Sequence, residues 1–139
     1  MSTRGGDRGQ AAVMIMGALL MVLAFVGLAV DGALMFTARR YLQNVADSAA
    51  LSGASALDEG AYRASTGLDV RLDPAAARRA VDRVLAASAL PGGTVADVDV
   101  APDRVTVRLR RPVSTTFLRI VGLREQRIGA TASASPQTG

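Results

Sequence analysis

The acidic side chains are the residues of this sequence that could do chemistry. Asp97 and Asp99 stand two residues apart with Asp103 close behind, a spacing that could supply ligands to calcium, and Asp58-Glu59 is a second close pair. Neither pair lies in the apolar surroundings that tune a carboxyl group for acid–base catalysis. Aspartates that alternate with apolar residues are more often the solvent face of a β-strand, and we interpret these three in that way.

The residues that catalysis most often uses are missing. The 139 residues include no histidine and no cysteine, which removes the commonest general base, the commonest metal ligand and every thiolate. Gly5, Gly6 and Gly9 precede an apolar run rather than joining a strand to a helix, so they do not form a phosphate loop, and GxSxG and HExxH motifs are absent. The sequence therefore predicts a protein that is not an enzyme and that binds no cofactor or metal.

The charges also limit the class of partner. The chain has 16 basic residues against 12 acidic ones, a net charge of +4, and every basic residue is arginine. Apart from Arg108, Arg110 and Arg111 the arginines are scattered, and aromatic residues make up only 4% of the chain. Nucleic-acid binding usually needs a clustered basic face with aromatic side chains for stacking. We expect no nucleic-acid partner; an anionic lipid or an acidic envelope polymer is favoured instead.

The longest apolar run of the sequence predicts where the charged residues around it lie. Ala11–Val30 holds 20 residues without a charge, and a helix of that length spans a hydrocarbon core of about 30 Å. We predict a short polar leader over residues 1–10 and a transmembrane helix over residues 11–38, with the lipid bilayer as a partner. Asp31 is then a membrane-interface residue, or a contact for a partner helix.

Two arginines mark the far end of this segment. Arg39 and Arg40 can extend their charged groups to the lipid headgroups and are predicted to lie at the membrane interface. A buried helix of a soluble protein and a cleaved signal peptide are the alternatives, the second because Gly27 and Ala29 have the small-residue spacing of a cleavage site. The length of the run and the helical period that continues past it favour the uncut membrane helix.

The helical period continues into an alanine-rich segment. We expect one helix from about Gln10 to about Leu57, with residues 39–58 as its continuation outside the membrane. Its apolar face is built of small side chains, which let another backbone approach closely. That face could be the core of the chain's own domain or a helix-assembly seam between subunits. The candidate seam residues are Ala46, Ala49, Ala50, Gly53 and Leu57.

The remainder predicts a small α+β domain over residues 59–139. Residues 58–73 have no clear period and are interpreted as a loop. Asp73-Pro74 is typical of a helix start, with Asp73 as the capping residue, and Pro91-Gly92-Gly93 stops that second helix.

Beyond this stop the apolar period changes from 3.6 to 2. The alternation predicts a β-hairpin of roughly residues 94–101 with 104–111, ended by Pro112, and a third strand over residues 127–134. We expect the aspartates and arginines of the hairpin to form cross-strand pairs on its solvent face. Between the strands, residues 116–121 are apolar and predict one or two helical turns closed by Gly122, which either fill the domain core or touch the membrane.

One family resembles the first part of the chain. Arg8-Gly9, the uncharged span, Asp31-Gly32, Arg39-Arg40 and the segment LQNVADSAALSGASAL (Leu42–Leu57) resemble the N-terminal region of TadE/TadG-like proteins. These are accessory membrane proteins of the tight-adherence, or Flp, type IV pilus system. The likeness covers about a third of the chain, and the remainder agrees in outline as a small outer domain.

This resemblance implies a non-catalytic, single-pass protein of the cytoplasmic (inner) membrane with its C-terminal domain outside the cytoplasm. It would be a pilin-like or accessory assembly subunit whose partners are other pilus-assembly or pilin-like membrane subunits, or further copies of itself. Pilins of this system are cut after a glycine that has a glutamate five residues on. Here the fifth residue after Gly9 is Met14, so the chain is closer to the uncut TadG-like type. The alternative is an anchored or secreted envelope-binding module without a role in pili.

Overall fold

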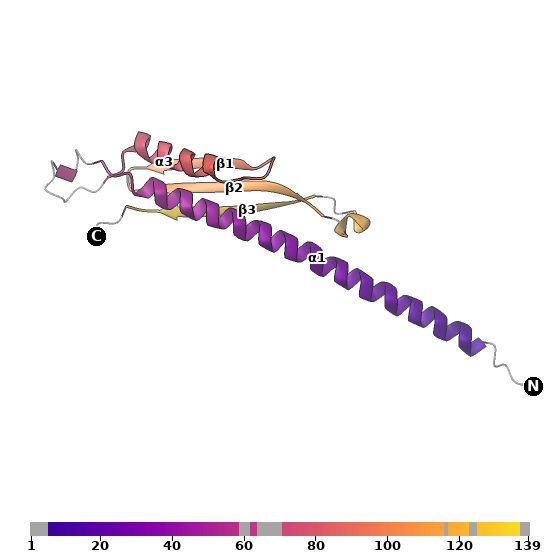
Figure 1. The fold of residues 1–139 in the computed structure, drawn as a ribbon. Helices are drawn as coiled ribbons and strands as arrows, with labels where there is room; N and C mark the ends of the chain where they lie inside the picture. The colour runs from indigo at the N-terminus through magenta and orange to yellow at the C-terminus, as the bar shows by residue number, and fades with distance from the viewer. Residues whose placement is uncertain (1–5, 59–61, 64–70, 116, 123–124, 137–139) are drawn as a thin grey trace, which may run out of the picture.

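A single long helix and a small sheet define the architecture (Figure 1). The computed structural model describes residues 6–58, 62–63, 71–115, 117–122 and 125–136. The predicted α+β class, with one long N-terminal helix, a second helix and a three-stranded antiparallel sheet, is confirmed. The elements are α1 (Gly6–Ala54), α3 (Pro74–Ala87), β1 (Val95–Ala101), β2 (Arg104–Ser114), the 3₁₀ turn η1 (Leu118–Val121) and β3 (Glu125–Ala134).

Helix α1 has two halves in different surroundings. Its 49 residues correspond to a rod of about 74 Å, and the first half projects beyond the rest of the molecule (Figure 1). Gly27 is the one buried residue between Gly9 and Val30, whereas Leu42 and most of the small residues after it are buried. The predicted continuous helix is therefore confirmed, and it ends at Ala54, a little before the expected Leu57.

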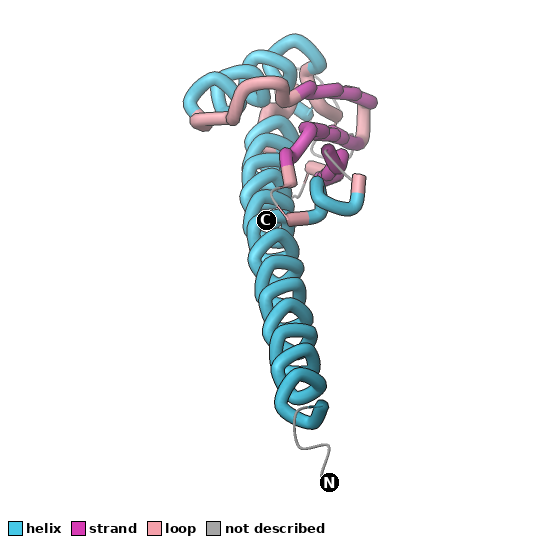
Figure 2. Tube along the Cα trace, turned by 90° about the vertical axis from the view of Figure 1, so that its right-hand side faces the viewer, coloured by secondary structure: helices cyan, strands magenta, loops and turns pink. Residues whose placement is uncertain are grey.

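The second half of α1 and helix α3 cover one face of the sheet. The strand order is β1-β2-β3, and the core forms where both helices meet the apolar side chains of β2 and β3 (Figure 2). Leu42 of α1, Val81 of α3 and Leu109 of β2 are all completely buried there. No described helix covers the other face of the sheet, which agrees with the alternation of apolar and polar residues along its strands.

The start of α3 follows the sequence signal. The Asp73 carboxylate accepts hydrogen bonds from the backbone N–H groups of Ala75 (2.9 Å) and Ala76 (3.0 Å), and Pro74 occupies the first helical position. These bonds satisfy two of the donors that a helix N-terminus leaves unpaired. The buried residues of α3 are Ala77, Ala80 and Val81.

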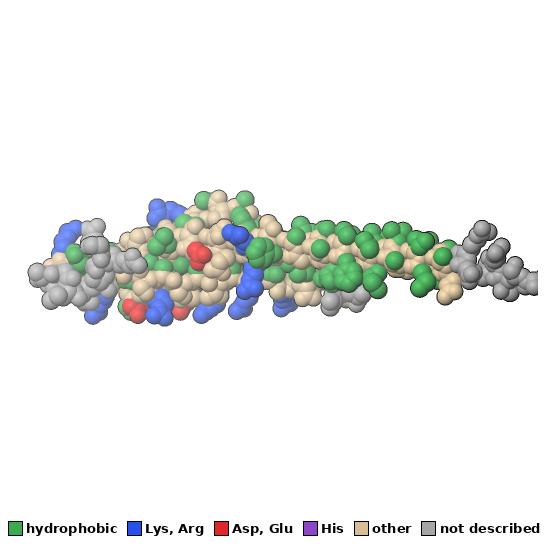
Figure 3. All heavy atoms as spheres, turned by 90° about the horizontal axis from the view of Figure 1, so that it is seen from below, with side chains coloured by type: hydrophobic (Ala, Val, Ile, Leu, Met, Phe, Trp, Pro, Cys, Tyr) green, Lys and Arg blue, Asp and Glu red, His purple; other side chains and the backbone are tan. Residues whose placement is uncertain are grey.

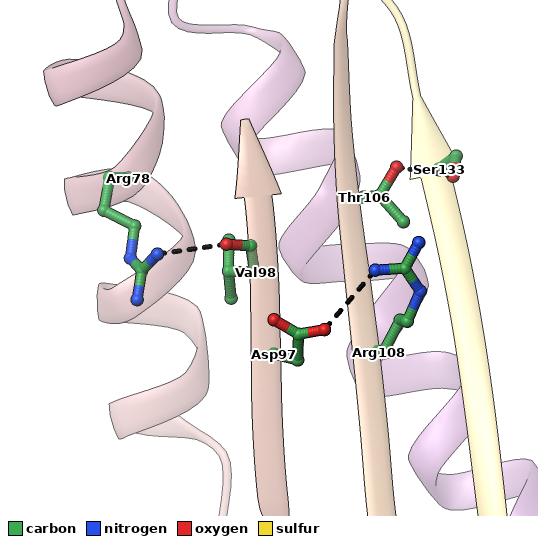
Figure 4. A network of polar contacts seen from close by, with 6 residues as sticks. All are labelled: Arg78, Asp97, Val98, Thr106, Arg108 and Ser133. Carbon is green, nitrogen blue, oxygen red and sulfur yellow. Dashed lines mark hydrogen bonds and ion pairs between the residues drawn. The ribbon is translucent and has the colours of Figure 1, made fainter. Parts of the chain in front are cut away.

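The hairpin register is the predicted one. Asp97 lies opposite Arg108, and the Arg108 guanidinium is 3.4 Å from the Asp97 carboxylate on the uncovered face (Figure 4). On the next strand pair, the hydroxyls of Thr106 and Ser133 are 3.0 Å apart. Of the cross-strand charge pairs expected from the sequence, Asp97 with Arg108 is confirmed, whereas Asp99 lies opposite Thr106.

Two strand ends differ from the expectation: the end of β2 and the start of β3, which begins at Glu125 and not at residue 127. Pro112 does not end β2, which continues to Ser114 and pairs there with Glu125 of β3. The prediction was wrong because β1 already stops pairing at Arg110, so the missing N–H of Pro112 lies where no β1 residue needs it.

Much of the loop predicted over residues 58–73 lies outside the described residues. Leu72, at its end, is buried and forms a bridge with Leu57.

The close approach of α1 to the sheet depends on Gly53. A Cβ at this position would lie 2.8 Å from the Val81 Cγ2 and 3.1 Å from the Val105 Cγ1, so Gly53→Ala must displace two branched side chains. We expect it to lower the free energy of unfolding by about 1–3 kcal/mol, measured by denaturant unfolding in detergent. Gly32→Ala is the matched control on the same helix, because a Cβ there meets nothing within 4 Å. Equal stability of the two variants would contradict this account of the packing.

Candidate functional site

The exposed half of α1 carries an extended apolar surface (Figure 3). Within the described part of the chain, one helix, Gly9–Ala54, is long and apolar enough to cross a membrane, with a mean hydropathy of 2.8 over its best window. Only 6% of that window is buried, and side chains such as Val13 and Phe25 are 73% and 66% exposed. A core helix of a soluble protein would be mostly buried, so this exposure favours single-pass membrane anchoring.

Asp31 has a structural role at the end of this surface. Its side chain is 2% exposed, although it follows directly on the uncharged run. One carboxylate oxygen, Oδ2, accepts hydrogen bonds from the backbone N–H groups of Phe117 and Leu118, each 2.8 Å long. Phe117 and Leu118 begin the η1 turn, so a carboxylate on α1 satisfies amides that the turn itself cannot pair. Charge-assisted bonds of this kind are roughly twice as strong as neutral ones.

Gly27 provides the space beside this carboxylate. It lies one helical turn before Asp31 on the same face of α1, and a Cβ at this position would collide with the ring of Phe117. Gly27 and Asp31 together form a site on α1, here called the helix socket, that holds the turn Phe117–Gly122. Gly122 closes the turn in the left-handed conformation (φ 90°), which only glycine adopts without strain.

The two arginines predicted at the interface lie farther along α1. Arg39 and Arg40 are both exposed, and the Arg40 guanidinium lies 5.9 Å from the centre of the Phe36 ring. That distance is compatible with a cation–π contact. The apolar surface of α1 therefore ends at a pair of charges that face solvent, while the earlier charge, Asp31, faces protein.

The small-residue face lies inside the chain's own domain. It packs against β2, β3 and α3, and Leu57 is half-buried beyond the helix end. The burial agrees with the core interpretation of this face, and contact with a partner subunit stays a prediction. The exposed fractions are 0% for Ala46, 0% for Ala49 and 1% for Ala50, and Gly53 is also buried.

Charged side chains lie on the uncovered face of the sheet and at its end. Arg110, Arg111, Glu125 and Arg127 line a hollow of about 400 Å³. Among the residues that the structure describes, no group of three or more aspartates or glutamates lies close enough together to hold a metal ion. Asp97 pairs with Arg108 across the hairpin. This face is polar and open, and it brings together no set of groups with a recognisable reaction.

Sequence reasoning missed the helix socket. Asp31 and Phe117 are 86 residues apart, so no local period links them. Two signals pointed to it separately. A carboxylate beside a membrane-spanning run needs a partner, and the apolar residues around Phe117 needed a surface to cover them. The sequence does not show that these two segments contact each other, because either one could be satisfied by a different part of the chain.

The fold and the exposed helix define a class: an α+β protein with one long N-terminal apolar helix, consistent with single-pass membrane anchoring. Comparison with known families then finds a match for that helix. Residues 9–56 match the family model described as "Putative Flp pilus-assembly TadE/G-like", which covers about a third of the chain. The chain thus carries a TadE/G-like Flp pilus-assembly domain, and the resemblance seen in the sequence is confirmed. No curated protein and no solved structure gives a significant match.

Removing the Asp31 carboxylate tests the socket. In Asp31→Ala the N–H groups of Phe117 and Leu118 lose their acceptor, at about 1–3 kcal/mol for each unpaired amide, so the turn should detach from α1. We expect faster hydrogen exchange in the peptide that contains residues 117–122, measured by mass spectrometry in detergent. Asp47→Ala is the matched control, because the Asp47 carboxylate accepts only an exposed bond from Gln43 on the same helix. Unchanged exchange at residues 117–122 would show that Asp31 does not hold the turn.

Proposed function

We propose that this protein is a non-catalytic, single-span membrane subunit of a Flp (tight-adherence) type IV pilus or a related secretion apparatus. It acts as a pilin-like or accessory assembly subunit in the inner membrane. In this proposal residues 11–38 cross the bilayer, residues 39–58 continue the helix outside it, and residues 59–139 complete an extracytoplasmic domain.

The observation that carries this proposal is the position of the family match. Residues 9–56 coincide almost entirely with α1, the helix that is exposed and apolar in one half and buried in the domain core in the other. The match therefore covers both the anchor and the element on which the outer domain folds. A protein that must hold a folded domain at a fixed place above a membrane requires this arrangement.

The direction of the chain across the membrane is part of the proposal. Arg4 and Arg8 on one side nearly balance Arg39 and Arg40 on the other, so positive charge does not select an orientation. The pilus-assembly context of the family favours the C-terminal domain outside the cytoplasm. Subunits of such an assembly meet one another there, beside or above the bilayer.

A second candidate function is an anchored envelope-binding module without a role in pili. The hollow lined by Arg110, Arg111 and Arg127 favours it, because three guanidinium groups around one open hollow could attract an acidic polymer. The two functions differ in their partners. The first requires association with other single-span subunits, whereas the second requires only the polymer.

The orientation can be tested by reporter fusion. A reporter that is active only after export, fused after Gly139, should be active, because residues 39–139 are proposed to lie outside the cytoplasm. A fusion in the same place with a reporter that works only in the cytoplasm is the control. Activity of the cytoplasmic reporter alone would reverse the proposed topology.

The seam can be tested by adding bulk to either side of α1. Ala50→Leu enlarges a residue that is 1% exposed, so we expect the domain to lose protease resistance at a cost of about 1–3 kcal/mol. Ser48→Leu adds bulk at an exposed position of the same helix and should leave the domain folded. Co-purification with related single-span subunits is then measured for both variants.

The pattern of results separates the two uses of the helix. Loss of association in Ser48→Leu with an intact domain would place the subunit contact on the exposed side of α1. Loss of association in Ala50→Leu with an intact domain would favour the small-residue seam itself. Association of the unaltered protein with no related subunit would contradict the assembly role and leave the envelope-binding module.

A further inference from the structure

The turn Phe117–Gly122 lies against the membrane-spanning half of α1 and not on the sheet. Its first two amides bond to Asp31, and its aromatic ring fills the space at Gly27. These contacts are the farthest that the outer domain reaches toward the start of α1 (Figure 1). The domain therefore extends beside the helix well below the level of Arg39.

The position of this contact along α1 can be compared with the thickness of a bilayer. A hydrocarbon core of about 30 Å is crossed by about 20 helical residues, which is the length of the uncharged run Ala11–Val30. Gly27 and Asp31 stand at the outer end of that run. Asp31 precedes Arg39 by eight residues, or about 12 Å of helix. The turn is thus level with the boundary between acyl chains and headgroups.

The residues of the turn have the chemistry of that boundary. Phe117 is 36% exposed even though its ring touches Gly27, Leu118 is half-buried, and the Arg119 side chain is exposed. Segments that lie in the membrane surface combine Phe and Leu side chains, which enter the acyl boundary, with basic side chains that reach water.

The two sides of α1 become polar at different heights. On the side of the turn, Gly27 and Asp31 are covered by protein. On the opposite side of α1, Phe36 is 64% exposed, and the apolar surface continues to Arg39. The boundary between acyl chains and headgroups therefore meets α1 at a different height on each side, so the helix axis is inclined to the membrane normal. Residues 11–38 measure about 42 Å against a core of about 30 Å, an excess that a helix accommodates by tilting.

We propose that the turn Phe117–Gly122 is a lipid-contacting element, here called the interfacial turn, which rests on the outer boundary of the bilayer and holds α1 at a tilt. The partner is the lipid surface. The helix socket keeps the turn at that depth, so the outer domain is fixed to the membrane at two places. This inference rests on the proposed membrane span.

The absence of tryptophan from the chain gives a direct test. Leu118→Trp and Phe117→Trp each place a single tryptophan in the interfacial turn. The proteins are reconstituted into phosphatidylcholine vesicles whose acyl chains carry bromine near the headgroup or near the middle of the bilayer. We expect the shallow bromine to remove most of the emission of both variants and the deep bromine to remove less.

Two exposed positions on α1 supply matched controls. Leu20→Trp lies near the middle of the span and should be quenched by the deep bromine, whereas Leu51→Trp lies 20 residues beyond Asp31 and should be quenched by neither. Adding Asp31→Ala to Leu118→Trp should weaken the shallow quenching, because the turn is no longer held at its depth. Should both turn variants fail to fold, Arg119→Cys labelled with a nitroxide measures depth by oxygen accessibility, since Arg119 is exposed and the chain has no other cysteine.

The outcomes separate this inference from the proposed function. Quenching at Leu20→Trp with none in the turn variants, or a water-accessible label at position 119, would overturn the interfacial turn and leave the span intact. That result would also be expected if a partner subunit covers Phe117. No quenching at Leu20→Trp would contradict the membrane span itself. Shallow quenching of the turn together with deep quenching at position 20 supports both.

Discussion

The fold depends on the burial of one sheet face against a helix whose other half is an exposed apolar segment. Val105, Val107 and Leu109 of β2 are completely buried, and α1 covers them together with α3. A sheet with one apolar face must bury that face against another element. The outer domain therefore cannot be separated from α1, and the helix cannot be treated as a tether. Any tilt of the membrane segment moves the domain with it, because the described helix continues unbroken from one part to the other.

Small residues on α1 follow from this double role. A helix that packs closely on both a sheet and a second helix has little room for side chains, and Ala46, Ala49 and Ala50 leave the backbone close to its neighbours. The same composition is found where membrane helices associate. Composition alone therefore cannot distinguish a core from a seam, whereas burial can. Because the small face is covered, exposed residues of α1 such as Leu51, which is 68% exposed, remain available to a partner.

Local patterns predicted most of this fold, and long-range contacts explain the rest. The cap at Asp73, the hairpin register and the continuous helix each depend on residues close in sequence, and all three were predicted. Pro112 was misjudged because its effect depends on where a different strand stops. The role of Asp31 could not be predicted because its partners lie 86 and 87 residues away. Sequence alone placed it beside the membrane; only the structure shows that it faces protein.

Asp31 is a charged group at the end of an uncharged run, and backbone amides of the turn stabilise it there. A carboxylate only accepts hydrogen bonds, and the first amides of a turn only donate them, so the two are complementary. With Gly27 one turn away, the same face of α1 offers an acceptor and a space for a ring. The core fixes one end of the domain to α1, and the socket fixes the other. Two attachments on one rigid helix remove the hinge that a single attachment would leave, and the orientation of the domain above the membrane follows from the helix.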